Sequence, residues 1–118
     1  MSNEEERKLC SRNELASVEN PKGIHRTTLA FNKETMLCHF VMKKGAVIPL
    51  HNHEAVQNGY VFSGKVQFRN SGGDLFLAES GSGYTFAGSE EHGAEVIEDA
   101  EVVECFAPMR PEYADNLE

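Results

Sequence analysis

The sequence contains no apolar run long enough to cross a membrane, because a spanning helix needs about 18–20 consecutive apolar residues. Its first ten residues also lack the apolar core of a secretory leader. Asp and Glu outnumber Lys and Arg by 19 to 11. This argues against nucleic acid as the main partner, since phosphate binding needs clustered basic residues. We therefore expect a cytoplasmic protein that binds neither a membrane nor a nucleic acid.

Paired cysteines are missing as well. The sequence has no CxxC motif, and its three cysteines, Cys10, Cys38 and Cys105, are widely spaced. An odd number of distant cysteines is typical of free thiols in a reducing compartment. Cys38 and Cys105 lie in apolar runs, so we expect both to be small core residues.

Helical periodicity is nearly absent. One short stretch, residues 11–18, is a candidate helix because Ser11 and Glu14 fit a capping box. From Gly23 onward, short β-prone runs alternate with turn residues and leave no room for a crossover helix. This pattern is typical of an antiparallel sandwich or barrel, with Ser63-Gly64 as the turn of a hairpin.

The predicted strands are Ile24–Phe31, Thr35–Lys43, Val47–His51, Gln57–Phe62, Lys65–Arg69, Asp74–Ala78, Tyr84–Ala87, Ala94–Ile97 and Glu101–Phe106. In the stretch Glu101–Ala107, one face carries Val103, Cys105 and Ala107, which is typical of a core face. The other face carries Val102, Glu104 and Phe106, and alternation alone leaves open whether it meets solvent or a cavity.

Two histidines separated by one residue, His51 and His53, would share one face of a strand because side chains alternate along it. Gln57 has the same parity if the strand resumes without a bulge, and His92 precedes a later strand. Imidazole nitrogens suit Zn, Ni, Fe, Mn or Co, and an amide oxygen is a harder supplementary ligand. The spacing thus indicates a metal site, whereas single histidines, such as His25 or His39 elsewhere in the chain, are ordinary surface or core residues.

Glycines extend this pattern into two longer motifs. Residues 45–64 read Gly45-AVIPL-His51-Asn52-His53-EAV-Gln57-NGYVFS-Gly64. This resembles the first motif of the cupin family, G-x5-H-x-H-x3,4-E-x6-G, with Gln57 in place of the usual Glu. Residues 81–96 keep the length of the second cupin motif, G-x5-P-x-G-x2-H-x3-N, but its Pro, Gly and Asn are replaced by Ala87, Ser89 and Val96.

The resemblance covers about residues 21–113. It implies an all-β cupin double-stranded β-helix (jelly-roll) barrel with a divalent metal ion (Zn, Ni, Mn or Fe) at His51, His53, Gln57 and His92. We accordingly divide the chain into an acidic, polar segment (1–20), a single cupin barrel (21–113) and a tail (114–118). Because all four expected ligands are neutral, the site would keep a charge of about +2, which favours an anionic ligand.

The end of the chain resembles the small cupins that act in pectin and alginate breakdown, which linearise ring-form 4,5-unsaturated uronates. That resemblance implies a pocket lined by an acid, Glu104, an aromatic wall, Phe106, and a guanidinium, Arg110. The acid in that family is typically Asp, so Glu104 is longer by one methylene. Gly59, which shares the parity of Gln57, would leave the pocket roomier.

Arg110 is the only basic residue among ten acidic ones between residues 90 and 118. It is either held for an anionic substrate or is a surface residue that bridges its acidic neighbours. Two further functions stay open at this stage, a metal-dependent cupin dioxygenase and a non-catalytic small-molecule-binding cupin. Small cupins typically dimerise, so we expect a homodimer in which a strand near Ile24–Phe31 covers an edge.

Overall fold

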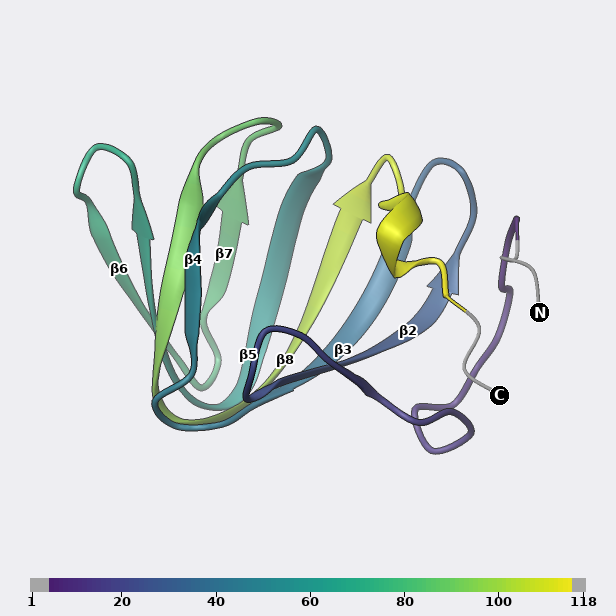
Figure 1. Ribbon diagram of the computed structural model, residues 1–118, viewed down its shortest axis with the longest axis horizontal. Coiled ribbons are helices and arrows are strands. Elements are labelled where there is room, and N and C mark those ends of the chain that lie inside the picture. The colour runs from purple at the N-terminus through teal and green to yellow at the C-terminus, as the bar shows by residue number, and fades with distance from the viewer. Residues whose placement is uncertain (1–4, 116–118) are drawn as a thin grey trace.

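The computed structural model describes residues 5–115 as a nearly all-β chain (Figure 1). Its elements are β1 (Val18–Glu19), β2 (Ile24–Phe31), β3 (Met36–Met42), β4 (Val47–His51), β5 (Val56–Asn70), β6 (Leu75–Glu79), β7 (Gly83–Phe86), β8 (His92–Ala107) and the 3-10 turn η1 (Pro111–Tyr113). All pairings between these strands are antiparallel. The all-β antiparallel class predicted from the sequence is therefore confirmed.

Two long strands, β5 and β8, run through both layers of the fold. They pair with each other from Val56↔Ala107 to Asn70↔His92. The second half of β8 also pairs with β3, and its first half pairs with β4. The first half of β5 pairs with β7, and its second half with β6. Figure 1 shows the two layers joined at the lower end and standing apart at the upper end, where β4 ends and β8 begins.

The crossing from one layer to the other occurs at Gly64. Its φ is +88°, and a Cβ there would lie 2.1 Å from the Asp99 carbonyl oxygen, so only glycine fits. The β5–β8 register shifts between Val61 and Val66. The hairpin predicted at Ser63-Gly64 is therefore wrong, because Gly64 bends one continuous strand. Ala94–Ile97 and Glu101–Phe106 are likewise parts of one strand, β8.

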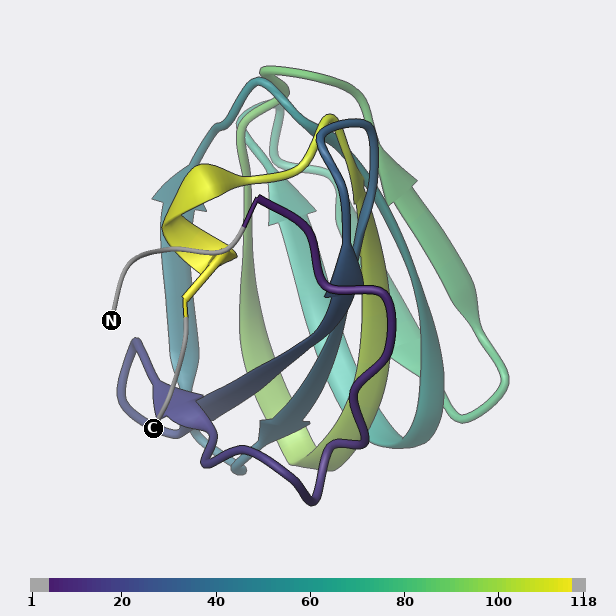
Figure 2. The ribbon, with the colours of Figure 1, turned by 90° about the vertical axis from the view of Figure 1, so that its right-hand side faces the viewer.

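The helix predicted for residues 11–18 is also wrong. The capping contact itself is present, since Ser11 N–H donates to Glu14 Oε1 at 2.6 Å. It closes only one turn, and no α-helix occurs within residues 5–115. Val18 instead pairs with Arg26 in β1 and β2, because this short segment gains more backbone partners from a strand than from an isolated turn. Figure 2 shows the N-terminal segment crossing the outside of the β2–β3 layer.

The inward face of β8 is the opposite of the one predicted as core. Val102 and Phe106 are 0% and 1% exposed, and Glu104 is buried between them. Cys105 is exposed on the outside, whereas Cys38 on β3 is fully buried as predicted. The error arose because both faces of this strand carry apolar residues, so alternation could not rank them.

Thiol labelling tests this orientation. Burial raises the pKa of Cys38 to about 12, so its thiol stays protonated and unreactive at pH 8. We expect a thiol reagent to modify Cys105 rapidly in the native protein and Cys38 only after unfolding. In a Cys10→Ser background, which removes the other solvent-accessible thiol, the variant Cys105→Ser should lose the fast phase. An unchanged fast phase in that variant would place Cys105 inside the barrel.

The sequence division into residues 1–20, 21–113 and 114–118 stays a prediction, and residues 1–4 and 116–118 lie outside the described part. Within residues 5–115 no helix is long and apolar enough to span a bilayer.

Candidate metal centre and adjoining pocket

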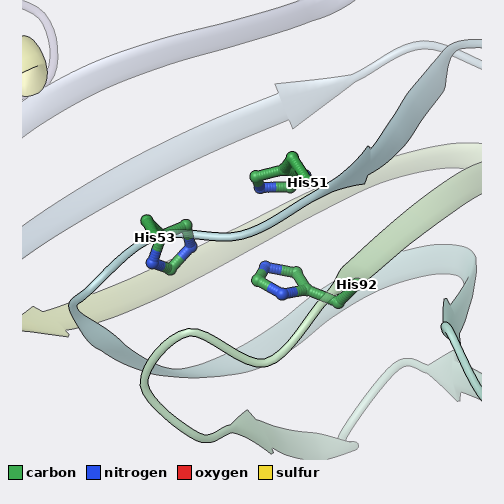
Figure 3. Close-up of side chains that lie close together, drawn as sticks. All are labelled: His51, His53 and His92. Carbon is green, nitrogen blue, oxygen red and sulfur yellow. The ribbon is translucent and has the colours of Figure 1, made fainter.

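Three histidines meet at the upper end of the barrel (Figure 3). His51 ends β4 and is paired directly with His92 at the start of β8, while His53 follows in the bend after β4. The centroids of the His51 and His92 rings are 4.5 Å apart, and the potential ligand nitrogens of the three residues all lie within 4.8 Å of one another. The cross-strand register and the His-x-His spacing together produce this cluster.

The outer nitrogen of each ring is already occupied by the backbone. In all three histidines Nδ1 lies within hydrogen-bond distance of a carbonyl oxygen, namely Pro49 for His51 (3.0 Å), Ala55 for His53 (2.8 Å) and Glu90 for His92 (2.8 Å). A carbonyl can only accept, so each Nδ1 must carry the proton. This tautomer leaves Nε2 of each ring with a free lone pair, as in metal-ligating histidines.

Gln57 provides a fourth donor atom. Its Oε1 lies 3.0 Å from His53 Nε2 and 3.2 Å from His92 Nε2. An acceptor oxygen so close to two nitrogen lone pairs requires a positive charge or a proton between them. Burial lowers the pKa of both His53 and His92, which disfavours the proton. Donors bound to one ion at 2.0–2.1 Å lie about 3.0–3.4 Å apart, so the two contacts of Gln57 Oε1 have the spacing expected of ligands that share a divalent metal.

The loop before β8 fixes the last ligand. Phe86 stacks on the His92 ring with a centroid distance of 4.4 Å and an interplanar angle of 7°. Ser89, which replaces a glycine of the second cupin motif, has a φ of +64°. Its N–H donates to the His53 carbonyl at 2.7 Å. Ser89 therefore adopts the left-handed backbone conformation that glycine adopts most easily.

Glu104 lies next to Gln57 on the inward face of β8. Its Oε2 accepts hydrogen bonds from Gln57 Nε2 at 2.8 Å and from the Tyr84 hydroxyl at 2.5 Å. Burial raises the pKa of Glu104, while these two hydrogen bonds and the charge of Arg110 oppose that shift. Gln57 is thus a bridge, with its oxygen toward the histidines and its amide nitrogen toward a carboxylate.

Tyr84 is a site residue that the sequence analysis missed. The space beside Gly59 that was expected to enlarge the pocket is filled by the Tyr84 ring, because a Cβ on Gly59 would lie 2.4 Å from it. That expectation was wrong. A tyrosine in a β-prone run carries no signal of its role, and only the register Gly59↔Tyr84 reveals it.

Arg110 follows β8 and packs against two aromatic rings. Its guanidinium carbon lies 5.2 Å from the centroid of Phe106 and 4.1 Å from that of Tyr113, and Phe106 in turn contacts the His53 ring edge-on at 5.8 Å. The Arg110 side chain is only 12% exposed, although its Nη2 is 3.0 Å from Glu112 Oε2. It is therefore a largely buried cation with one exposed acidic neighbour.

Arg26 anchors the turn that carries Arg110. Its guanidinium lies 4.2 Å from the Tyr113 ring centroid and pairs with Asp115 at 2.6 Å. The Thr28 hydroxyl also donates to the Tyr113 carbonyl at 2.7 Å. These contacts tie η1 to β2 and hold Tyr113 between two guanidinium groups.

One cavity connects two of the three histidines with Gln57, Glu104 and Arg110. It is lined by residues that include His51, Gln57, His92, Glu104, Arg110 and Tyr113. The structure therefore places the candidate acid and the candidate anion-binding arginine beside the histidine cluster. The other two histidines lie elsewhere, His39 against Glu101 at 2.7 Å and His25 3.9 Å from Glu19.

Searches by sequence find no match, neither to a family model nor to a curated protein. Solved structures do match. An RmlC-like cupin from Shewanella frigidimarina NCIMB 400 superposes with a TM-score of 0.82 at 24% identity, covering 93% of this chain and 99% of the other. The chain has the cupin fold.

Two further cupin-fold structures show how far the similarity extends. KdgF from Halomonas sp. has a TM-score of 0.80 and 26% identity, over 88% of this chain and 97% of that one. Ectoine synthase from P. lautus has a TM-score of 0.75 and 19% identity, over 85% and 77%. At such low identity the synthase shows only the shared fold, whereas the resemblance of this chain to KdgF agrees with the sequence motifs.

The Gln57 bridge gives a prediction about charge. Gln57→Glu should tighten metal binding, because it adds a negative ligand, and weaken binding of anionic substrates. It also replaces a hydrogen bond to Glu104 with two buried carboxylates in contact. We expect the metal-free variant to lose about 2 kcal/mol of unfolding free energy.

The control for this prediction is the exchanged pair, Gln57→Glu with Glu104→Gln, which restores one amide and one carboxylate. Urea unfolding of the metal-free proteins should show the double variant close to the parent. If Gln57→Glu alone unfolds at the parent's urea concentration, the two side chains are not in contact.

Proposed function

We propose that this cupin binds a divalent metal ion at His51, His53, Gln57 and His92 and uses it to isomerise a sugar acid. The substrate class would be ring-form 4,5-unsaturated uronates, which are opened to linear keto sugars. The observation that carries the proposal is the shared cavity, in which Glu104 and Arg110 stand beside the histidine cluster.

A metal held there would supply a Lewis acid that polarises a ring oxygen or hydroxyl of the substrate. All four proposed ligands are neutral, so the site favours a substrate that brings negative charge. This property suits a carboxylate-bearing sugar better than an uncharged one.

Glu104 is the proposed proton-transfer group. Its Oε2 is fixed by two donors, while Oε1 accepts no hydrogen bond from residues 5–115. Since no fully buried side-chain oxygen in this part of the chain lacks a partner, Oε1 must reach the cavity. A raised pKa helps a carboxyl group both to take a proton and to return it. Taking a proton from one substrate atom and giving it to another leaves the formula unchanged, as an isomerisation requires.

Arg110 is the proposed partner of the substrate carboxylate. Its packing against the rings of Phe106 and Tyr113 restrains the guanidinium before substrate arrives, which favours a two-point contact with a carboxylate. Glu112 holds one edge of the group at 3.0 Å and shows that a carboxylate suits it. Phe106 forms an apolar wall beside the metal site.

The similarity to KdgF at 26% identity supports this proposal, together with the resemblance of the C-terminal residues to the small cupins of pectin and alginate breakdown. Ectoine synthase shares the fold with this chain but at 19% identity, so its name lends no support to a different chemistry here.

Turnover of an unsaturated uronate tests the proposal. Metal-loaded protein should remove the absorbance of the conjugated alkene, and protein stripped by a chelator should do so only after metal is restored. Metal content is measured in parallel. Protein that binds stoichiometric metal but leaves such uronates untouched would exclude the sugar-acid reaction while keeping the metal site.

A further inference from the structure

Three residues form a row across neighbouring strands on the inside of the barrel. In the register, Gly59 of β5 is opposite Tyr84 of β7 on one side and opposite Glu104 of β8 on the other. Residues opposite one another point to the same face. A side chain at position 59 would therefore stand between the tyrosine and the carboxylate.

Because position 59 is glycine, Tyr84 reaches across β5. The ring occupies the place of the missing side chain, since a Cβ there would lie 2.4 Å from both Cζ and Oη of Tyr84. The hydroxyl then donates to Glu104 Oε2 at 2.5 Å. This glycine has an ordinary strand conformation rather than a positive φ, so space is the reason that this position suits glycine.

Glu104 links Tyr84 to Gln57 through a second hydrogen bond. Its Oε2 receives the amide nitrogen of Gln57 at 2.8 Å, which turns the amide oxygen toward His53 and His92. If the amide were reversed, its oxygen would face a carboxylate and its NH2 group would face the histidine nitrogens. The position of the Glu104 carboxylate therefore determines which end of Gln57 a metal would meet.

We propose that Tyr84 is a positioning residue that acts through Glu104 to orient the metal-facing oxygen of Gln57, and that Gly59 is required to admit it. This inference rests on the proposed metal site. The inference goes beyond that site because it makes the metal affinity and the position of the Glu104 carboxylate depend on Tyr84, a residue outside the proposed ligand set.

The alternative is that Tyr84 only fills space. Its ring packs on Phe68 with a centroid distance of 4.3 Å and lies 6.1 Å from Phe86. Tyr84→Phe keeps this packing and removes only the hydroxyl. A space-filling role predicts no effect on Gln57 or on metal affinity, whereas a positioning role predicts both.

The first experiment compares Tyr84→Phe with Tyr60→Phe. Tyr60 follows Gly59 on β5, points to the outer face and is 45% exposed, so its variant removes an equivalent hydroxyl away from the site. In metal-free protein, NMR should show the side-chain NH2 signals of Gln57 shifted by Tyr84→Phe and unmoved by Tyr60→Phe. Gln57→Glu identifies the signals by removing them.

Metal affinity is measured next by competition with a chelator. Loss of a group that orients a ligand costs about 10–100-fold in affinity or activity, and we expect Tyr84→Phe to lower Ni or Zn affinity by about tenfold. With an unsaturated uronate, kcat should fall while KM changes little, because the Arg110 contact is untouched. Gly59→Ala should reproduce the affinity loss by displacing the ring.

A double-mutant cycle separates positioning from structure. In the Glu104→Ala background, Tyr84→Phe should cause no further loss of metal affinity. Unchanged Gln57 signals and unchanged affinity in Tyr84→Phe would overturn the inference, as would a full additional loss in the Glu104→Ala background. These readouts need no substrate, so failure to turn over uronates would leave them decisive.

Discussion

Replacing His51 or His92 with alanine is expected to strip the bound metal from the protein. A structural zinc site of four ligands contributes about 10–16 kcal/mol, so each ligand accounts for about 3 kcal/mol, or roughly a 100-fold loss of affinity. The double variant should contain no stoichiometric metal by elemental analysis after dialysis. His92→Ala should also destabilise the metal-free protein, because it removes the ring stacked on Phe86.

The matched control is His25→Ala. His25 is a partly exposed histidine whose ring lies 3.9 Å from Glu19, and it is not part of the histidine cluster. Its variant should keep the full metal content. Stoichiometric metal in the His51→Ala/His92→Ala double variant would instead place the ion elsewhere in the chain.

If the proposed uronate isomerisation is correct, Glu104→Gln and Arg110→Lys should impair it in different ways. In Glu104→Gln the amide oxygen can still accept from both Gln57 and Tyr84, so the network survives while the proton acceptor is lost. Turnover should fall by about 10²–10⁴-fold, with substrate affinity nearly intact. Steady-state kinetics on an unsaturated uronate separate kcat from KM.

Arg110→Lys keeps the positive charge but loses the planar fork and its cation–π contacts with Phe106 and Tyr113. Loss of one charge-assisted contact costs about 1.5–3 kcal/mol, so we expect KM to rise by about tenfold to a hundredfold. Neither variant should release the metal. Full turnover by Glu104→Gln would leave the reaction in place and assign the proton transfer to another group.

The sequence was most informative where residue type and parity act together. The His-x-His pair and the glycines of the first cupin motif predicted the histidine cluster, because a metal ligand set needs specific side chains at a fixed spacing. The strand positions were also mostly right. Ser63-Gly64 was misread because a glycine that bends a strand between layers and one that closes a hairpin look alike locally.

The contacts between strands could not be predicted in the same way. Nothing near Tyr84 in the sequence indicates that it meets Glu104, since the two are joined only through the pairing of each with Gly59. The prediction of which face of β8 is buried was wrong for a related reason. Val103 and Cys105 are as apolar as Val102, and only the packing of β3 and β5 decides which set is buried.

The sharing of β5 and β8 between the layers has a consequence for how metal enters and leaves. Gln57 and His92 lie on these two strands, whose amide hydrogens should exchange only when the whole domain unfolds. His51 and His53, by contrast, belong to the end of β4 and the bend after it, and β4 pairs with β8 alone. Local fraying of β4 would withdraw two ligands while the other two remain in place. Metal exchange should therefore be much faster than global unfolding and should follow the opening of this one strand.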